Sequence, residues 1–261
     1  INNVSKYNKI NNYIFPVGLR KILKPTTISN ANVIFKTGSE ICLGNNSYLH
    51  FINSDITIEG EKNIPVRIRG CDLSNDNKNS GSLIFQDSNI KISNLNLNNL
   101  IAPNKRLSIL YGGANFIGSI VRINNLESDY SRSEDAINFI NSVVNANNLS
   151  INNAISDGID SDFSNLNIKS INCLKVGNDC IDFSFSKASI DNLVSSYTGD
   201  KSISLGESSI LDALEVKLNN GEIGIVSKDN STLRINKYEY ENIKLPHASF
   251  VKKPEFEPPQ V

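Results

Sequence analysis

Hydrophobic and polar residues alternate with a period of two within short segments of this chain. In the segment CIDFSF, Ile181, Phe183 and Phe185 fall on one face, and Asp182 and Ser184 fall on the other. Such alternation is typical of β-strands with one buried face, because successive side chains of a strand point to opposite sides. Asn, Ser and Ile are abundant, which suits many short strands joined by polar turns.

The alternating segments form an internal repeat. Residues of similar type recur at intervals of 22 in three aligned series: Ser142, Ser164, Ser186 and Ser208, continued by Asn230; Ile137, Ile159, Ile181 and Ile203; and Phe139, Ser161, Phe183 and Leu205. A period of this length is too short for a helical repeat such as an ankyrin or TPR unit. It predicts an all-β fold, a single-stranded right-handed parallel β-helix with one repeat per coil. A leucine-rich repeat has a similar period, but its LxxLxL…N pattern is missing.

The regularity of the repeat changes along the chain and predicts three parts. Residues 1–30 are expected to cap the open end of the solenoid, because an unpaired strand edge invites aggregation. Residues 31–242 are expected to form the parallel β-helix, less regular in its first half. Residues 243–261 are rich in Pro and charge, which predicts a C-terminal tail or linker.

Composition and charge exclude several classes of protein. The formal net charge is −1 over 261 residues, so the whole chain offers no electrostatic basis for binding nucleic acid or an anionic membrane. No run of about 18 apolar residues is present, so no membrane-spanning segment is expected. The chain begins at Ile1 and contains no Met, which indicates a mature form or an excised fragment.

The four cysteines, Cys42, Cys71, Cys173 and Cys180, show no CxxC pairing of the kind found in zinc or redox sites. Buried free thiols are the expected state. A Cys173–Cys180 disulfide is the alternative.

Aligning the repeats on the inward Ile places acidic residues in columns. The next, outward position has Asn138, Asp160, Asp182 and Ser204 on successive coils, and the position two before the Ile has Asp135, Asp157, Asp179 and Lys201. Equivalent residues on neighbouring coils lie about 4.8 Å apart, and like charges directly opposite each other destabilise a sheet. Such columns require a shared proton, a bound cation or a salt bridge.

Two interpretations of these columns follow. Oxygen-only ligands favour Ca²⁺ over zinc, which makes Asp157, Asp160, Asp179 and Asp182 the predicted calcium ligands, with Asp162 beside them. Alternatively, Asp157 and Asp179 only end turns, where an Asp side chain bonds the backbone two residues further on.

Other side chains extend the candidate site. Lys201 and Lys228 follow the acidic residues on the next two coils and are candidate catalytic residues together with Asp157 and Asp179. Candidate substrate-binding residues are Asp182, Glu207 and Tyr197, and Tyr111 and Tyr130 are further aromatic candidates from adjoining loops. His50 and His247 lie far from this region of the sequence, which argues against a His-based mechanism.

Several consecutive segments resemble a known group of proteins. SEDAINFINS, SDGIDSDFS, GNDCIDFSFS, GDKSISLGESS and GIVSKDNS, within roughly residues 133–255, are similar to right-handed parallel β-helix proteins that are often associated with spore-coat-type (CotH-like) kinase modules in bacteria. The resemblance implies the fold and an extracellular or cell-envelope setting. It brings no catalytic residues with it.

A second, weaker resemblance is to pectin-degrading polygalacturonases, which carry N-T-D, D-D, G-H-G and R-I-K on successive coils. The corresponding residues here include Asp157, Asp179 and Lys228, which match. Asn178 replaces the first Asp of the pair, and Lys201 lies in the segment that replaces G-H-G. The resemblance implies a pectate lyase-like fold and a carbohydrate substrate, but the usual assignment of acid and base does not transfer.

Three functions are consistent with these observations. The first is a lyase for acidic polysaccharide that uses calcium-assisted β-elimination, with Lys201 or Lys228 as the base. The second is an inverting glycoside hydrolase with two of the Asp residues as acid and base. The third is a non-catalytic solenoid that binds glycan or acts as a spacer in a larger surface protein. Polysaccharide is the expected partner, nucleic acid is not, and a homotrimer or fusion to another domain is compatible with the fold.

Overall fold

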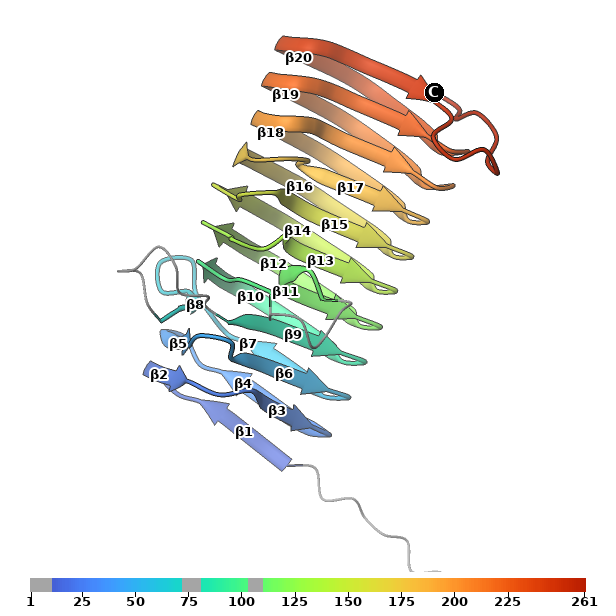
Figure 1. Ribbon diagram of the computed structural model, residues 1–261. Coiled ribbons are helices and arrows are strands. Elements are labelled where there is room, and N and C mark those ends of the chain that lie inside the picture. The colour runs from blue at the N-terminus through green and yellow to red at the C-terminus, as the bar shows by residue number, and fades with distance from the viewer. Residues whose placement is uncertain (1–10, 72–80, 103–109) are drawn as a thin grey trace, which may run out of the picture.

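The computed structural model describes residues 11–71, 81–102 and 110–261, and within them the chain is a parallel β-solenoid without helices (Figure 1). This confirms the predicted fold class. The first strands are β1 (Asn11–Phe15), β2 (Gly18–Ile22), β3 (Thr26–Ser29), β4 (Ala31–Phe35), β5 (Ser39–Leu43), β6 (Tyr48–Ile52), β7 (Asp55–Ile58), β8 (Val66–Gly70) and β9 (Ser82–Gln86). The middle strands are β10 (Asn89–Asn98), β11 (Gly112–Ile117), β12 (Ile120–Asp129), β13 (Asp135–Ile140), β14 (Val143–Asn152) and β15 (Asp157–Asp162). The last are β16 (Asn165–Val176), β17 (Ile181–Ser184), β18 (Lys187–Gly206), β19 (Ile210–Lys228) and β20 (Thr232–Phe250).

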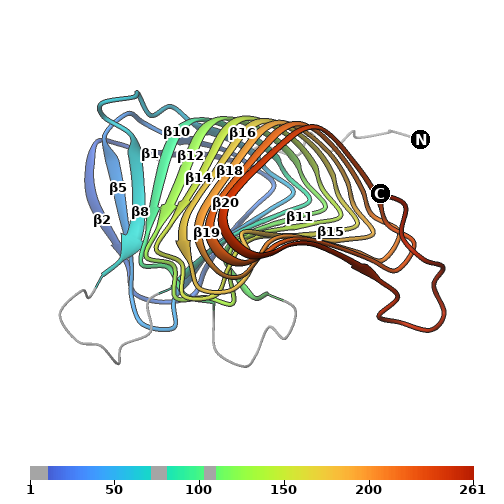
Figure 2. The same cartoon turned by 90° about the horizontal axis from the view of Figure 1, so that it is seen from above.

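Each coil contributes strand segments to three parallel ladders. The first coils keep three separate strands, so that β1 pairs with β4, β2 with β5 and β3 with β6. From β10 onward one long strand spans the first two ladders, because it pairs with both β7 and β8. The third ladder continues through β9, β11, β13, β15 and β17 into the C-terminal part of β18. Figure 2, seen along the solenoid, places β11 and β15 on one side and β10, β12, β14 and β16 on the other.

The parallel pairing extends past both limits of the predicted β-helix, residues 31–242. On the N-terminal side, residues Asn11–Phe15 already pair in register with Ala31–Phe35. On the C-terminal side, β20 pairs with β19 as far as Phe250 opposite Lys228. Beyond β20 the chain turns back along the solenoid, where the Asn230 amide donates to the Glu257 carbonyl at 2.6 Å.

Stacked hydrophobic columns fill the interior, as the repeat predicts. Ile137, Ile159, Ile181 and Ile203 are in register and fully buried. A column of phenylalanines, Phe15, Phe35, Phe51, Phe85, Phe116 and Phe139, places each ring centroid 4.4–5.9 Å from the next. Burying one such side chain stabilises a fold by about 1.5–3 kcal/mol, and the spacing adds favourable aromatic contacts.

A serine ladder fixes the same turn on successive coils from Ser54 to Ser209. The backbone N–H of each serine donates to the hydroxyl of the serine on the following coil, through Ser54, Ser88, Ser119, Ser142, Ser164, Ser186 and Ser209. The last steps span 22 or 23 residues. The ladder therefore continues at Ser209, one residue after the predicted Ser208, because Glu207 lengthens that turn.

The cysteines form two disulfides, and the expectation of free thiols is wrong. Cys42 pairs with Cys71 across 29 residues, and Cys173 pairs with Cys180 across 7. Cys42 and Cys71 are far apart in the sequence, but Cys42 lies in β5 and Cys71 directly follows β8. These two strands are neighbours in one ladder, so the cysteines are close in space. No helix within residues 11–71, 81–102 and 110–261 is long and apolar enough to cross a membrane.

Candidate functional site

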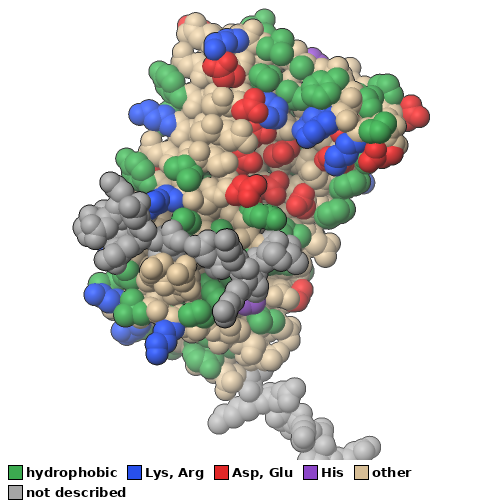
Figure 3. Space-filling model, viewed as in Figure 1, with side chains coloured by type: hydrophobic (Ala, Val, Ile, Leu, Met, Phe, Trp, Pro, Cys, Tyr) green, Lys and Arg blue, Asp and Glu red, His purple; other side chains and the backbone are tan. Residues whose placement is uncertain are grey.

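The predicted acidic residues gather on the outer surface of the third ladder. We call this surface the acid face and define it by Asp135, Asp157, Asp160, Asp162, Asp179 and Asp182, which come from β13, β15, the turn before β17 and β17 itself. Figure 3 shows Asp and Glu side chains clustered on this side of the molecule, with Lys and Arg side chains beside them.

Asp160 and Asp182 lie directly opposite each other on neighbouring strands, as the repeat predicts. Asn138 precedes them in the column and Ser204 follows. Burial raises the pKa of Asp160 to about 9, and the negative charges of Asp135, Asp162 and Asp182 add to the shift. Asp160 therefore holds a proton at neutral pH.

Asn138 occupies the position directly opposite Asp160 on β13. Its Oδ1 atom is buried and has no hydrogen-bond partner within the described part of the chain. Its Nδ2 donates to Asp135 Oδ2 at 3.0 Å. Burial, followed by the charges of Asp157 and Glu134, raises the pKa of Asp135 to about 7. At the N-terminal end of the acid face, bound protons thus take the place of basic counterions.

Asp157 and Asp179 connect successive coils through hydrogen bonds. Asp157 Oδ1 accepts from the backbone N–H of Asp179 at 2.8 Å and from Asn178 Nδ2 at 2.6 Å. Asp179 Oδ1 in turn accepts from the backbone N–H of Lys201 at 3.0 Å. Both carboxyl groups therefore have a structural role, but they bond the backbone of the next coil and not that of their own turn. Gly158 belongs to the same junction, because a Cβ at this position would lie 2.5 Å from the Cys180 carbonyl oxygen.

Lys201 neutralises the C-terminal end of the acid face. Its Nζ lies 3.0 Å from Asp179 Oδ1 and also contacts Asp200 Oδ2. Burial acts to lower the pKa of Lys201, but the hydrogen bonds to Asp200 and Asp179 outweigh it and raise that pKa. Burial raises the pKa of Asp179 to about 6 despite the bond to Lys201. A lysine held in this way is a charged partner and is poorly suited to act as a base.

Lys228 and Glu207 border the acid face on the following coils. Lys228 is buried, and its Nζ donates to Ser204 Oγ at 2.9 Å, so that its ammonium ends the Asp160–Asp182 column. Glu207 Oε2 accepts from Ser184 Oγ at 2.7 Å, and its other oxygen lies 2.5 Å from Lys253 Nζ. Burial opposes these bonds, but together they lower the pKa of Glu207.

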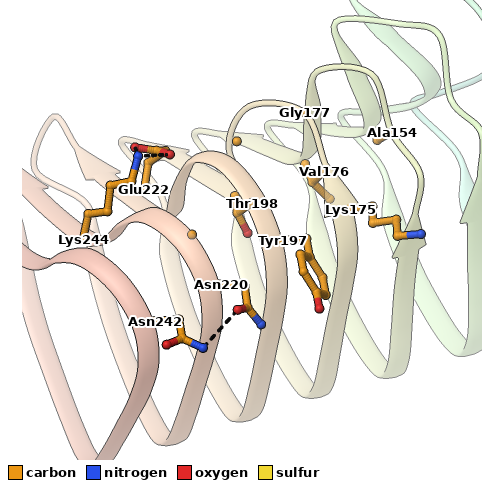
Figure 4. Close-up of a pocket in the computed structure, with 12 residues that line it drawn as sticks. Ala154, Lys175, Val176, Gly177, Tyr197, Thr198, Asn220, Glu222, Asn242 and Lys244 are labelled. Carbon is orange, nitrogen blue, oxygen red and sulfur yellow. Dashed lines mark hydrogen bonds and ion pairs between the residues drawn. The ribbon is translucent and has the colours of Figure 1, made fainter.

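Tyr197 is separated from the acidic residues. It stands exposed beside a groove of about 630 Å³ that Asn220, Asn242, Glu222 and Lys244 also line (Figure 4). None of the acid-face residues lines that groove. The structure therefore does not bring the predicted substrate-binding Tyr197 together with Asp182 and Glu207.

Two aromatic residues beside the acid face were not recognised in the sequence. The rings of Phe163 and Phe185 stack with centroids 4.9 Å apart, and the side chains are 58% and 43% exposed. The expectation that Phe185 faces the core with Phe183 is wrong, since the strand ends at Ser184 and Phe185 lies in the turn. Both residues have φ of 52°, an unusual conformation for a bulky side chain. Asn141 occupies the same turn one coil earlier, and replacement of Asn by Phe there is the signal that could have identified them.

The described acidic residues are not arranged as a metal site. No group of three or more His, Cys, Asp or Glu side chains within residues 11–71, 81–102 and 110–261 could hold a metal ion as placed. Asp157 and Asp179 each use one carboxylate oxygen to bind the backbone of the next coil. The donor set predicted for Ca²⁺ therefore does not fit without rearrangement.

Comparison with known proteins yields no family. No protein-family model matches the chain, and no curated protein matches it. Among solved structures, the chain is similar to the catalytic domain of a GH87 α-1,3-glucanase in complex with tetrasaccharides, with 7% identity, a TM-score of 0.30 and 96% of this chain covered. The chain spans 64% of the length of that domain. At this level of similarity the comparison carries no argument about function, and the resemblances to CotH-associated proteins and polygalacturonases stay predictions.

Proposed function

We propose that the acid face binds polysaccharide and hydrolyses glycosidic bonds, with Asp160 as the proton donor. The observation that carries the proposal is the pair formed by Asp160 and Asp182. Asp160 keeps its proton at neutral pH, and the negative charge of Asp182 is one of the reasons. A carboxyl group that keeps its proton, next to a second carboxyl group, is the arrangement that glycoside hydrolysis requires.

The spacing of the pair indicates the type of hydrolysis. The strands that carry Asp160 and Asp182 are adjacent and about 4.8 Å apart. This strand spacing is closer to the carboxyl separation of retaining enzymes, about 5–5.5 Å, than to that of inverting enzymes, about 6.5–9.5 Å. In the proposed reaction Asp160 protonates the glycosidic oxygen while Asp182 attacks the anomeric carbon. Water then cleaves the glycosyl ester, with Asp160 acting as the base. This differs from the inverting hydrolase, which was one of the three functions consistent with the sequence.

The exposed aromatic pair supports a sugar ligand. Phe163 directly follows Asp162, and Phe185 directly follows Ser184, so both rings lie at the edge of the acid face. Flat aromatic faces supply contact area to the apolar side of a sugar ring. The strained backbone at both positions is a feature that clusters at ligand-binding sites.

The elimination mechanism is less well supported. It needs a neutral lysine near the substrate, whereas Lys201 contacts two carboxylates that raise its pKa. Lys228, the other candidate base, is buried and donates to Ser204 beside Asp182. In the proposed hydrolysis it has a role in substrate binding instead. The proposal does not require calcium, and a calcium ion at this face remains a separate proposal.

The proposed setting is extracellular or in the cell envelope. Its support is the pair of disulfides, because such bonds form and persist in oxidising compartments. Polymers of the cell surface or surroundings are then the accessible substrates.

Incubation of the purified protein with a panel of neutral and acidic polysaccharides tests the function. We expect reducing ends to appear without absorbance near 235 nm, to persist in EDTA and to be lost in Asp160→Asn. Asp191→Asn, on β18 outside the acid face, is the matched control. Absorbance at 235 nm that EDTA abolishes would instead establish calcium-dependent elimination. Binding without either product would establish the non-catalytic alternative.

A further inference from the structure

A second groove lies on the opposite side of the solenoid from the acid face. It has a volume of about 400 Å³ and is formed by β10, β12, β14 and β16. Figure 2 places these strands across the solenoid from β15. Its polar lining includes Lys91, Arg122, Lys169, Asn145, Asn147 and Asn167. We call it the basic groove.

Within the described residues, no ion pair joins the basic side chains of this groove to an acidic side chain, although Asp191 follows Lys169 at the same position of the next coil. Lys91 and Arg122 are direct partners on β10 and β12, a position at which like charges destabilise a sheet. Within the described part of the chain, neither residue nor Lys169 makes an ion pair or a side-chain hydrogen bond. Glu127 of β12 and Asp191 of β18 are acidic residues of nearby strands, and neither lines the groove.

The same column shows a different arrangement farther along the solenoid. The positions after Arg122 are Asn145, Asn167 and Ser189, followed by Asp212 and Arg234. There the guanidinium of Arg234 lies 3.0 Å from Asp212 Oδ1. At the C-terminal end of the column, Arg234 and Asp212 thus neutralise each other. At the N-terminal end, Lys91 and Arg122 are neighbours of the same charge and lie over the groove.

We propose that the basic groove binds the anionic groups of an acidic polysaccharide, carboxylate or sulfate. The guanidinium of Arg122 can offer paired donors to such a group, and Lys91 and Lys169 supply further charge. Between them, the amides of Asn145 and Asn167 are suited to hydroxyl groups of the sugar. The site is distinct from the acid face and goes beyond the hydrolysis proposed there.

The lining favours polysaccharide over nucleic acid. Single-stranded nucleic acid is held by aromatic platforms on which bases stack, and the groove is lined without an aromatic side chain. Proteins that bind duplex DNA can make about 6–10 phosphate contacts. The three basic side chains of this groove provide fewer. An acidic polysaccharide bound in this groove would anchor the protein to that polymer and leave the acid face accessible to substrate.

Fluorescence-anisotropy titration with labelled polymers tests the proposal. Polygalacturonate and dextran sulfate are the anionic probes and separate carboxylate from sulfate. Neutral dextran and a single-stranded oligonucleotide are the comparison ligands. We expect at least one anionic polysaccharide to bind, with affinity that falls as salt increases, and neutral dextran not to bind.

The variant Lys91→Gln/Arg122→Gln should bind at least tenfold more weakly than the wild type. It removes a like-charge contact, so its melting temperature should be equal or higher, which separates lost binding from lost folding. Lys62→Gln, an exposed lysine outside the groove, should bind as the wild type does. No binding of either anionic polysaccharide, equal binding by the double variant, or tighter binding of the oligonucleotide would overturn the proposal.

Discussion

Asp160 of β15 and Asp182 of β17 occupy the same outward position on adjacent coils, and the pKa of Asp160 is raised to about 9. Burial is the larger cause, and the charge of Asp182 contributes to it. A solenoid repeats its side chains at the spacing of its strands, so a repeated acid is necessarily a pair of neighbouring charges. At Asp160 the repulsion is relieved because the carboxyl group keeps its proton, and not by an ion pair with a basic side chain.

The acid face should make stability fall as pH rises. The folded-state pKa of Asp160, about 9, and that of Asp135, about 7, exceed the unfolded value of 3.8, so the folded protein binds more protons between those limits. Asp160→Asn removes part of this dependence. At pH 8 the variant should be more stable than the wild type by at least about 1 kcal/mol, since one pKa unit corresponds to about 1.4 kcal/mol. Urea unfolding at pH 5 and pH 8 measures both proteins, and a variant less stable at pH 8 would contradict the prediction.

Removing the charge of Lys201 should destabilise the fold. Lys201→Met leaves Asp179, which is 2% exposed, without its ionic partner. Breaking a buried pair from one side costs about 3–5 kcal/mol, and because the lysine is partly exposed we expect about 2–3 kcal/mol. In Lys201→Met/Asp179→Asn, much of this loss should be recovered. Equal losses in the single and double variants, measured by urea unfolding, would show that the ion pair is not the cause.

Phe163 should contribute to binding rather than to stability. Phe163→Asn replaces an exposed ring with a residue that accepts positive φ, as Asn141 does one coil earlier. We expect the free energy of unfolding to change by less than about 1 kcal/mol, while affinity for the polysaccharide identified in the panel falls severalfold. Isothermal titration calorimetry and thermal unfolding separate the two effects. Unchanged affinity would remove the aromatic pair from the proposed site.

The disulfides should stabilise the protein by different amounts. The chain-entropy model gives about 3–4 kcal/mol for a loop the length of Cys42–Cys71 and about 2–3 kcal/mol for that of Cys173–Cys180. Replacing either pair with serine should lower the free energy of unfolding accordingly. Mass spectrometry after alkylation without reductant should detect no modified cysteine. Alkylation of native protein at any of the four would contradict the pairing.

The columns of the solenoid could be predicted because strand periodicity and a constant repeat determine them together. Ile159 and Ile181 are in register in the core, and Asp160 and Asp182 are in register outside it. The predicted alignment of the repeats failed at turns, because one added residue in a turn shifts the alignment of the residues that follow it. Glu207 shifts the serine ladder from Ser208 to Ser209, and the end of β17 at Ser184 turns Phe185 outward.

The hydrogen-bond and disulfide partners of individual side chains were harder to predict from the sequence than the columns. Alternation predicts that Asp157 and Asp179 lie near each other, but only the path of the turn shows that each accepts a backbone N–H from the next coil. The disulfide Cys42–Cys71 depends on an irregular early coil, where the repeat length varies. The basic groove is also missed, because Lys91 and Arg122 are separated by a coil longer than 22 residues.

The most direct test of the account is the titration of the Asp160 carboxyl group by ¹³C NMR. Comparison of wild type with Asp160→Asn assigns the carboxyl resonance, and Asp191 serves as an acidic residue outside the face. The account predicts that the Asp160 resonance keeps its protonated chemical shift at pH 7 and changes only at higher pH. A resonance that has already titrated below pH 5 would show that Asp160 is an ordinary ionised carboxylate, and would remove the proton donor from the proposed reaction.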